Sequence, residues 1–300
     1  MVYTVTFNPA LDYTLSVDSL CFERINRASD AEISYGGKGI NVSVILTRLG
    51  VENTALGFSA GFTGKELEAL LNADNIKNDF VHIENGATRI NVKIRYGKEL
   101  DINTDGAQIS EKDIATLNEK LNIIESGDYL VLAGSVPKTL KNSGYELILE
   151  SLKHKDLRLI VDAEDELLLG TLKYKPFLIK PNHHELGAIF NADIDSDEKA
   201  VFYAKELQKL GAQNVLVSLA ERGAILVDEH GNIHKISNAE GTLINSVGCG
   251  DSMLAGFIAG YIKSGDYAEA LKLAGACGNA TAFSQGLAKK SEIERIYNSL

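Results

Sequence analysis

The sequence predicts an α/β protein with a doubly wound, mostly parallel sheet flanked by helices. Short apolar segments alternate with segments of helical spacing along most of the chain, which is the pattern of such a sheet. The chain has 300 residues, of which 45% are hydrophobic and 24% charged, so it can bury a sizeable core. No repeat, low-complexity tract or proline-rich linker divides it, and we therefore expect residues 1–300 to form a single domain.

The expected strands are short apolar runs, which are typical of strands buried on both faces of a parallel sheet. They lie at Val2–Asn8, Thr54–Ser59, Asp128–Ala133, Leu157–Asp162, Phe177–Lys180 and Asn214–Leu219. Helical spacing predicts helices between them, and the first of these helices ends at a glycine, a common helix stop. The expected helices lie at Gly39–Leu49, Lys65–Asn72, Glu111–Ile124, Gly144–Lys153, Glu198–Leu210, Asp251–Lys263, Tyr267–Phe283 and Ser291–Leu300.

Two segments depart from this alternation of buried strands and helices. Asp12–Asp18 and Arg89–Tyr96 alternate polar and apolar residues, as half-exposed antiparallel strands do. Glu99–Asn103 can pair with the second segment through a turn at Gly97. We expect a small sheet, formed by about residues 11–20 and 88–104, that projects from the main domain. Such a sheet could be a lid, a dimer surface or an ordinary edge hairpin.

Charge and cysteine content exclude several classes of function. The formal net charge of −11 argues against nucleic acid or an anionic membrane as the main partner. The three cysteines have no CxxC spacing, so a disulfide framework or a zinc site is not expected and a reducing cytosol fits best. The N-terminal residues read as a strand and not as a signal peptide, and no run approaches the length of a membrane span.

The first segment that carries chemistry is YGGKGIN, residues 35–41. Its glycines, Gly37 among them, let the backbone approach a ligand closely at the start of a helix, where free N–H groups point outward. Lys38 can bind a phosphate or a hydroxyl, and Asn41 can hydrogen-bond a hydroxyl. The segment is not a Walker A loop, because GxxxxGK[ST] is absent. A tight strand-to-helix turn with a solvated lysine is the alternative.

The second segment, KPNHHEL at residues 180–186, follows a short strand and so lies at a carboxyl end of the sheet, where α/β folds bind ligands. Asn182 and Glu185 are three residues apart and can share a face that holds a hydrated Mg²⁺. Lys180 can contact a phosphate. We expect His183 and His184 to point apart as exposed residues at a helix start. The alternative is a capped helix that follows a proline.

The third segment is VSLAERGA, residues 217–224. One strand ends at Ser218 and another begins at Gly223, which makes a β-turn-β unit at the same edge of the sheet. This unit could hold a nucleotide or be a plain hairpin.

The fourth segment is NSVGCGDSMLAGF, residues 245–257. Gly248, Cys249 and Gly250 precede or open a helix whose first turn contains Asp251. Free backbone N–H groups there suit the negative charge that develops on a phosphoryl group, and the aspartate can accept a hydroxyl proton as the phosphate transfers. An aspartate that only favours the helix dipole, by ~0.3–1 kcal/mol, is the alternative. Cys249 is either a thiol activated by the helix N-terminus or an inert side chain that points away from the ligand.

With these segments in place, the chain resembles the ribokinase-like sugar kinases of the phosphofructokinase B family from end to end. The motifs in the family's order are NPALD (8–12), GGKGIN (36–41), TRINVK (88–93), AGSVP (133–137), KPNxxEL (180–186), VSLxxxGA (217–224) and GxGDS (248–252). The resemblance implies a doubly wound α/β domain with a small β lid, which often serves as a dimer clasp.

The resemblance also implies roles for individual residues. Asp251 would be the base that deprotonates the sugar hydroxyl, and Gly248, Cys249 and Gly250 would form the anion hole. The sugar site would include Asp12, Gly37, Lys38, Asn41 and Ser135. ATP would lie against Lys180, Asn182, Ser218, Gly223, Gly250 and Asn279, the last near the adenine, with Mg²⁺ ordered by Asn182 and Glu185.

The identity of the sugar depends on the lid. Arg89 in a lid strand suits a phosphate already present on the substrate, because its planar fork binds phosphate with two hydrogen bonds. Arg27 is a second candidate cation. TRINVK followed by DIN at 101–103 resembles the 1-phosphofructokinase branch, which favours fructose 1-phosphate over tagatose 6-phosphate. The sequence departs from the family at Cys249, at Ala220 and at residues 104–106, where Asp105 adds an acid beside the expected phosphate.

A protein of a different class, a catalytically idle sugar or nucleotide sensor on the same scaffold, is the competing interpretation. A sensor has no need to keep both a base and the metal-ordering residues. The joint presence of Asp251, Asn182 and Glu185 therefore favours an enzyme.

Overall fold

The main element of the fold is a nine-stranded sheet in the order β13-β12-β11-β10-β9-β8-β1-β4-β5. The computed structural model describes the backbone of residues 1–300 and all side chains except those at 98, 99, 139, 141 and 142. Neighbouring strands from β5 to β11 are parallel, and β12 and β13 add an antiparallel edge. The strands are β1 (Val2–Thr6), β4 (Asn53–Ala60), β5 (Val81–Ile83), β8 (Tyr129–Ala133), β9 (Arg158–Asp162), β10 (Leu178–Ile179), β11 (Asn214–Ser218), β12 (Ala224–Val227) and β13 (Ile233–Ile236).

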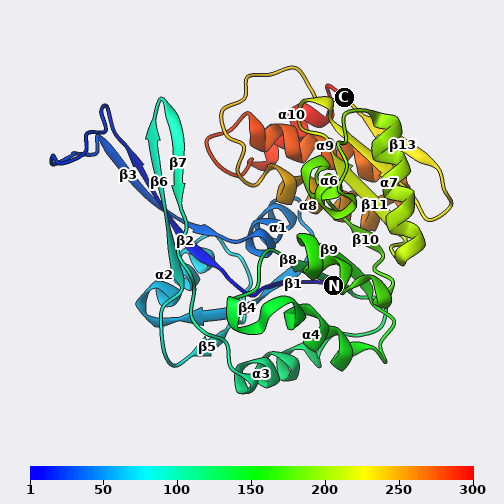
Figure 1. Cartoon of the computed structure of the whole chain (residues 1–300), viewed down its shortest axis with the longest axis horizontal. Coiled ribbons are helices and arrows are strands. Elements are labelled where there is room, and N and C mark those ends of the chain that lie inside the picture. The colour runs from blue at the N-terminus through cyan, green and yellow to red at the C-terminus, as the bar shows by residue number, and fades with distance from the viewer.

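Helices cover both faces of this sheet, so the predicted doubly wound fold is confirmed (Figure 1). One face carries α1 (Lys38–Arg48), α2 (Gly61–Ala73), α8 (Cys249–Ser264), α9 (Tyr267–Ala282) and α10 (Lys290–Tyr297). The other carries α3 (Glu111–Leu121), α4 (Gly144–Leu152), α5 (Asp165–Leu169), α6 (His183–Phe190) and α7 (Asp197–Leu210). Among the described residues, no helix has the length and apolar character needed to cross a bilayer.

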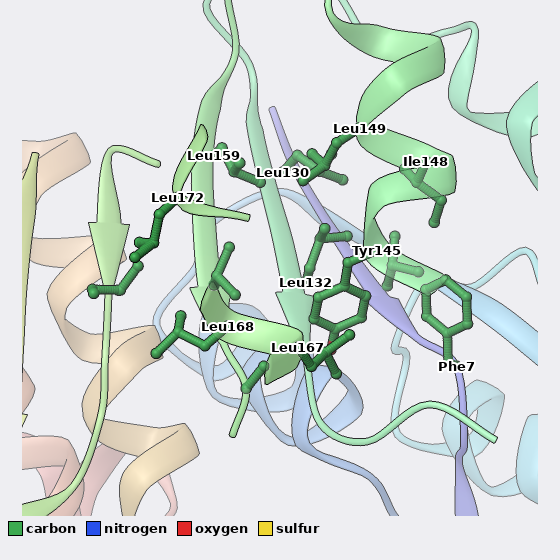
Figure 2. Close-up of a cluster of buried hydrophobic side chains, with 14 of the residues drawn as sticks. Phe7, Leu130, Leu132, Tyr145, Ile148, Leu149, Leu159, Leu167, Leu168 and Leu172 are labelled. Carbon is green, nitrogen blue, oxygen red and sulfur yellow. The ribbon is translucent and has the colours of Figure 1, made fainter. Parts of the chain in front are cut away.

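The larger apolar cluster lies between the sheet and the α3–α7 layer (Figure 2). Phe7 and the fully buried Tyr145 of α4 pack with ring centroids 5.5 Å apart. Burying a side chain of this size stabilises the fold by roughly 1.5–3 kcal/mol. The hydroxyl of Tyr145 donates to the carbonyl of Gly134 at 2.7 Å. The core therefore fixes the loop after β8, in which Gly134 lines a cavity together with Lys38.

A second, four-stranded sheet in the order β3-β2-β6-β7 stands away from the main sheet (Figure 1). Its strands are β2 (Ala10–Ser16), β3 (Asp30–Gly36), β6 (Arg89–Tyr96) and β7 (Lys98–Ile102). The expected segments are present, but the sequence interpretation omitted β3. As predicted, each of the two segments has an antiparallel neighbour, β3 for β2 and β7 for β6. β2 pairs with β3 in the antiparallel sense and with β6 in the parallel sense.

The register of the small sheet separates an apolar face from a polar face. Paired positions put Tyr13, Ile33 and Val92 on one face, where Ile33, Leu100 and Ile102 remain about half exposed. Alternate positions put polar side chains on the opposite face. They are Asp12, Thr14, Asn91, Lys93 and Arg95.

Other boundaries shift only slightly from the predicted ones. α2 begins at Gly61, four residues before the expected start, and a short 3₁₀ turn at Ala220–Arg222 joins β11 to β12. The expected β-turn-β unit is therefore present. The edge strands β5 and β13 were not expected, because a run of three or four residues gives too little periodicity to identify a strand.

Candidate active site

The N-terminus of α8 lies at the carboxyl edge of the main sheet and forms a turn with free N–H groups. Gly248 caps the helix with φ of 79°, a left-handed conformation that favours glycine, and a Cβ there would lie 2.6 Å from Leu287. The first intrahelical hydrogen bond from this end is donated by Ser252 N to Gly248 O. The N–H groups of residues 249–251 thus precede the helical ladder, as an anion-binding helix end requires.

Asp251 lies at the edge of this turn and is only 7% exposed. Asn41 of α1 donates its side-chain N–H to Asp251 Oδ2 at 2.7 Å. Burial, with the nearby Asp162 carboxylate, raises the pKa of Asp251 to about 6, although the Asn41 hydrogen bond and two lysines oppose the shift. A carboxylate in this range is ionised at neutral pH and is a better proton acceptor than an exposed aspartate. Asn41, which was expected to contact the sugar, thus holds the candidate base.

Two lysines converge on a buried aspartate beside the same turn. Asp162, at the end of β9, is fully buried and forms ion pairs with Lys38 at 3.2 Å and Lys180 at 3.1 Å. Burial alone would raise the pKa of Asp162, but the two ammonium groups lower it. Burial would likewise lower the pKa of Lys38, but Asp162, Glu185 and Asp251 raise it. Asp162 and Lys38 are therefore charged at neutral pH.

This arrangement places positive charge next to the turn at residues 248–250. A Cβ built on Gly250 would lie 3.2 Å from Lys180 Nζ, so the ammonium group sits directly on the turn. Sequence reasoning missed Asp162, although a lone acid that ends a buried apolar strand was a usable signal. An acid in that position has no hydrophobic reason to be there and lies at the ligand-binding edge of the sheet.

Asn182 and Glu185 form a capping box at the start of α6. Asn182 Oδ1 accepts from Glu185 N at 2.9 Å, and Asn182 N donates to Glu185 Oε2 at 2.8 Å. The structure thus contains the capped helix that was the alternative interpretation of this segment. The other carboxylate oxygen of Glu185 lies 4.0 Å from Lys38 Nζ.

No group of three or more His, Cys, Asp or Glu side chains with the geometry of a metal cage occurs among the described residues. Mg²⁺ usually keeps several waters and binds one or two carboxylates together with substrate phosphates. The Glu185 oxygen that lies outside the capping box, 4.0 Å from Lys38 Nζ, fits that mode of binding.

The two adjacent histidines of α6 differ from expectation. His184 is exposed and His183 half-buried, but their rings lie together with centroids 3.9 Å apart instead of pointing apart. Successive Cβ atoms diverge by about 100° around a helix, yet imidazole rings are long enough to meet. Both rings border the cavity described next.

A cavity of about 590 Å³ opens beside the turn, and it unites residues that are far apart in sequence. It is lined by five of the residues predicted for the nucleotide, namely Asn182, Ser218, Gly223, Gly250 and Asn279. Gly223 has φ of 85°, and a Cβ there would lie 2.0 Å from the carbonyl of Ile236, so only glycine fits. Cys249 also lines the cavity. Burial, with the neighbouring Asp251, raises the pKa of Cys249 to about 11, which favours the inert thiol over the activated one.

A second cavity, of about 380 Å³, lies on the other side of Asn41 and faces the polar side of the small sheet. Asp12 lies in its wall, pairs with Lys93 at 2.9 Å and accepts from Asn91 at 2.9 Å. Sequence reasoning missed Lys93 and Asn91. The signal was available, because residues 89, 91 and 93 alternate along β6 and must share one face with Arg89. Gly37 opens α1 with φ of 123° beside this region.

The remaining predicted substrate residues divide into two groups. Arg89 donates Nε–H to the carbonyl of Asn8 at 3.2 Å, and Asn8 approaches Ser135 Oγ at 3.5 Å, so Arg89 and Ser135 lie on one side of the cleft. Burial lowers the pKa of Arg89, although Asp12 and Asp105 act against this. Arg27 is exposed in the loop between β2 and β3, at the far end of the small sheet (Figure 1), and is not brought to the cleft within one chain.

Comparison with known proteins extends over the whole chain. The pfkB family of carbohydrate kinases matches residues 6–294. A 1-phosphofructokinase of Bacillus subtilis is 42% identical over 296 residues, which cover 99% of this chain and 97% of that protein. A D-tagatose-1-phosphate kinase of Bacillus licheniformis is 38% identical and covers 100% and 98% of the two chains.

A solved structure supports the same relationship. Phosphofructokinase-2 from Escherichia coli, in complex with fructose-6-phosphate, superposes with a TM-score of 0.92 at 28% identity, covering 99% of this chain and 98% of that one. The match covers the main sheet, its helices and the small sheet. The chain therefore belongs to the pfkB family of carbohydrate kinases.

Proposed function

We propose that the protein transfers the γ-phosphate of ATP to a ketohexose phosphate, with fructose 1-phosphate as the preferred substrate and fructose 1,6-bisphosphate and ADP as products. The observation that carries this proposal is the buried Asp251, with its pKa raised to about 6, at the edge of a helix N-terminus flanked by Lys38 and Lys180. Phosphoryl transfer needs a base and preorganised positive charge more than it needs covalent chemistry.

The residues suggest how the reaction proceeds. Asp251 accepts the proton of the sugar's primary hydroxyl as that oxygen attacks the γ-phosphorus of ATP. The new O–P bond forms while the bond to the bridging oxygen of ADP breaks, and the electron pair leaves with ADP. The N–H groups of residues 249–251 and the ammonium of Lys180 lie where charge develops on the transferring group. Asp162 pairs with both lysines and orients them.

Asn182 and Glu185 are the residues we assign to Mg²⁺, which neutralises phosphate charge when bound. The capping box fixes one oxygen of the Glu185 carboxylate, and the other oxygen lies 4.0 Å from Lys38 Nζ. Asn182 thus acts through Glu185 as a positioning residue. Ser218, Gly223 and Asn279 border the cavity that we assign to the nucleotide, with Asn279 toward the adenine.

The substrate assignment rests on Arg89 and on the relatives. Arg89 is half-buried beside Asn8 and Ser135, and among the described residues none accepts from its two terminal nitrogens, which leaves the fork for a phosphate. The names of the relatives support a ketose 1-phosphate, fructose in one case and tagatose in the other. Tagatose 6-phosphate is the alternative substrate that the sequence left open, and it is included in the assay below. A catalytically idle sensor is disfavoured, because the base, the lysines and the Glu185 carboxylate are assembled at one edge of the sheet.

We also infer one kinase domain whose small sheet acts as a lid and as the contact surface of a homodimer in the cytosol. The polar face of the small sheet borders the substrate cavity. On the apolar face, Leu11 and Ile90 pack against α1 and α2, whereas the outer part of the face stays exposed. Ile33, Leu100 and Ile102 are each about half exposed there. A second copy would cover this face and would bring a second Arg27 loop into the assembly.

A coupled ADP-release assay tests the function. Purified protein is given MgATP with fructose 1-phosphate, tagatose 1-phosphate, tagatose 6-phosphate, fructose 6-phosphate or ribose. We expect the highest kcat/KM with fructose 1-phosphate. Turnover on ribose alone would contradict the phosphosugar assignment, and no turnover on any sugar would favour the sensor.

A further inference from the structure

Asn8, just after β1, connects three segments on the substrate side of the cleft. Its carbonyl accepts from Arg89 Nε, and its side-chain nitrogen approaches Ser135 Oγ. Its side-chain oxygen packs on Gly106, where an added Cβ would lie 2.4 Å away. Arg89, which we assign to the substrate phosphate, and Ser135, which was predicted for the sugar site, therefore border residues 104–106, the segment in which this chain departs from the family pattern.

A salt bridge crosses this same region. Lys138 donates to Asp105 Oδ2 at 3.1 Å, and the two side chains are 87% and 80% exposed. Asp105 precedes Gly106 in the segment that leaves the small sheet after β7. Lys138 lies three residues after Ser135, in the loop that follows β8, and lines a cavity of about 490 Å³ together with Ser135 and Lys38. The bridge thus joins the two sides of the region around Asn8.

The carboxylate of Asp105 interacts electrostatically with Arg89. Burial lowers the pKa of Arg89, and the carboxylates of Asp12 and Asp105 act in the opposite direction, so Asp105 lies within electrostatic reach of the guanidinium. An unpaired carboxylate at this place would repel a phosphate that approaches Arg89. Lys138 is the group that neutralises it in the free protein.

We propose that Lys138 is a specificity-determining residue for the phosphosugar, one that shields Asp105 in the free enzyme and moves to the sugar's phosphate when substrate binds. This rests on the proposed function. An exposed lysine–carboxylate pair is worth only about 0–1 kcal/mol, so it is easily exchanged. A phosphate offers about −1.5 to −2 charges and three acceptor oxygens, against one charge on Asp105. The flexible lysine stem allows the ammonium to move between the two.

The test measures steady-state kinetics with fructose 1-phosphate for the wild type and for Lys138→Gln, Lys138→Arg and Asp105→Asn. Lys138→Gln should raise the KM for fructose 1-phosphate about three- to tenfold, with kcat and the KM for MgATP unchanged. Lys138→Arg should restore the KM, and Asp105→Asn should lower it below the wild-type value. Lys153→Gln, which removes an exposed lysine from its pair with Glu150, is the matched control and should change nothing.

An unchanged KM in an active Lys138→Gln enzyme would overturn the inference, as would a rise in KM that Lys138→Arg does not reverse. A fall in kcat would indicate a structural role and would also overturn it. If the wild type fails to turn over any sugar phosphate, the proposed function is wrong. Calorimetric binding of fructose 1-phosphate then decides the role of Lys138, because equal affinity of wild type and Lys138→Gln refutes it.

Discussion

At the residue scale, Asp251 combines two properties that a catalytic base needs. It is buried and accepts a hydrogen bond from Asn41, and its pKa is raised to about 6. Burial makes the carboxylate more basic, while the Asn41 amide fixes which oxygen remains free for the substrate. The same burial makes the ionised form costly to the fold, so activity and stability are linked at this residue.

We expect Asp251→Asn to lower kcat by about 10²–10⁴-fold while MgATP still binds, because the amide cannot accept the proton. The wild-type rate should fall below about pH 6 as the base becomes protonated. Rate measurements from pH 5 to 8 and ATP binding by calorimetry check this. Near-normal turnover by Asp251→Asn would mean that another group is the base.

The same substitution should stabilise the fold at neutral pH. The folded state holds the proton up to about pH 6 and the unfolded chain only to its usual value of 3.8, so this carboxyl favours folding at low pH. That contribution is lost as the pH rises through 6. Asp251→Asn should therefore raise the free energy of unfolding by about 1–3 kcal/mol at pH 7.5 and by almost nothing near pH 3.5. Equal effects at both values would contradict the raised pKa.

Cys249 provides a second prediction at this scale. Its pKa of about 11 leaves it almost wholly in the unreactive thiol form at neutral pH. Iodoacetamide should therefore modify the exposed Cys21 long before Cys249, with activity retained. Peptide mapping against time provides the check. Rapid inactivation that ATP prevents would show that the thiol is activated after all.

At the element scale, the candidate functional groups all lie at the ends of helices and strands. The turn before α8 presents N–H groups, the start of α6 presents Glu185, and the ends of β9 and β10 present Asp162 and Lys180. Parallel strands all end at one edge of a sheet, so residues distant in sequence meet there.

The capping box of α6 gives a prediction for this scale. Asn182→Ala removes the acceptor for Glu185 N and should destabilise the protein by about 0.5–2 kcal/mol, and it should also raise the KM for MgATP, because Glu185 loses its fixed orientation. Ser110→Ala removes the equivalent cap of α3, away from the cleft, and is the matched control. It should show the loss of stability without the change in KM. If both variants changed the KM for MgATP equally, Asn182 would have no specific role in the MgATP site.

At the scale of the whole molecule, the small sheet has one polar face and one apolar face. Asp12, Asn91 and Lys93 form a hydrogen-bonded group on the polar face, while the outer part of the apolar face leaves Ile33, Leu100 and Ile102 about half exposed. Exposed apolar surface of this kind marks an interaction site. The strict alternation along β2, β3, β6 and β7 produces both faces from one set of strands.

We expect the wild type to be a dimer in sedimentation velocity experiments, and Leu100→Glu combined with Ile102→Glu to be monomeric, because two charges would be buried in the contact. Phe202→Glu, at a 57% exposed position on α7, is the control and should stay dimeric. A monomeric wild type would refute the lid-mediated dimer. A monomeric wild type would also mean that Arg27 is a surface residue that does not reach a substrate site.

The sequence by itself determined the fold class and indicated most residues of the candidate site. Strand and helix periodicity, with ordered motifs, identified the doubly wound sheet, Asp251, Gly248, Lys180 and Asn182, because these depend on local pattern. The alternation of TRINVK also contained the information that Asn91 and Lys93 share a face with Arg89.

Only the tertiary structure decided which groups touch. The pairing of Lys38 and Lys180 on Asp162, the Asn41 contact to Asp251 and the Lys138 bridge to Asp105 join residues separated by 18 to 210 positions. The addition of β3 to the small sheet and the contact between His183 and His184 were likewise unpredictable. These features depend on side-chain packing and strand order, which arise when the chain closes on itself and leave no periodic signal in the sequence.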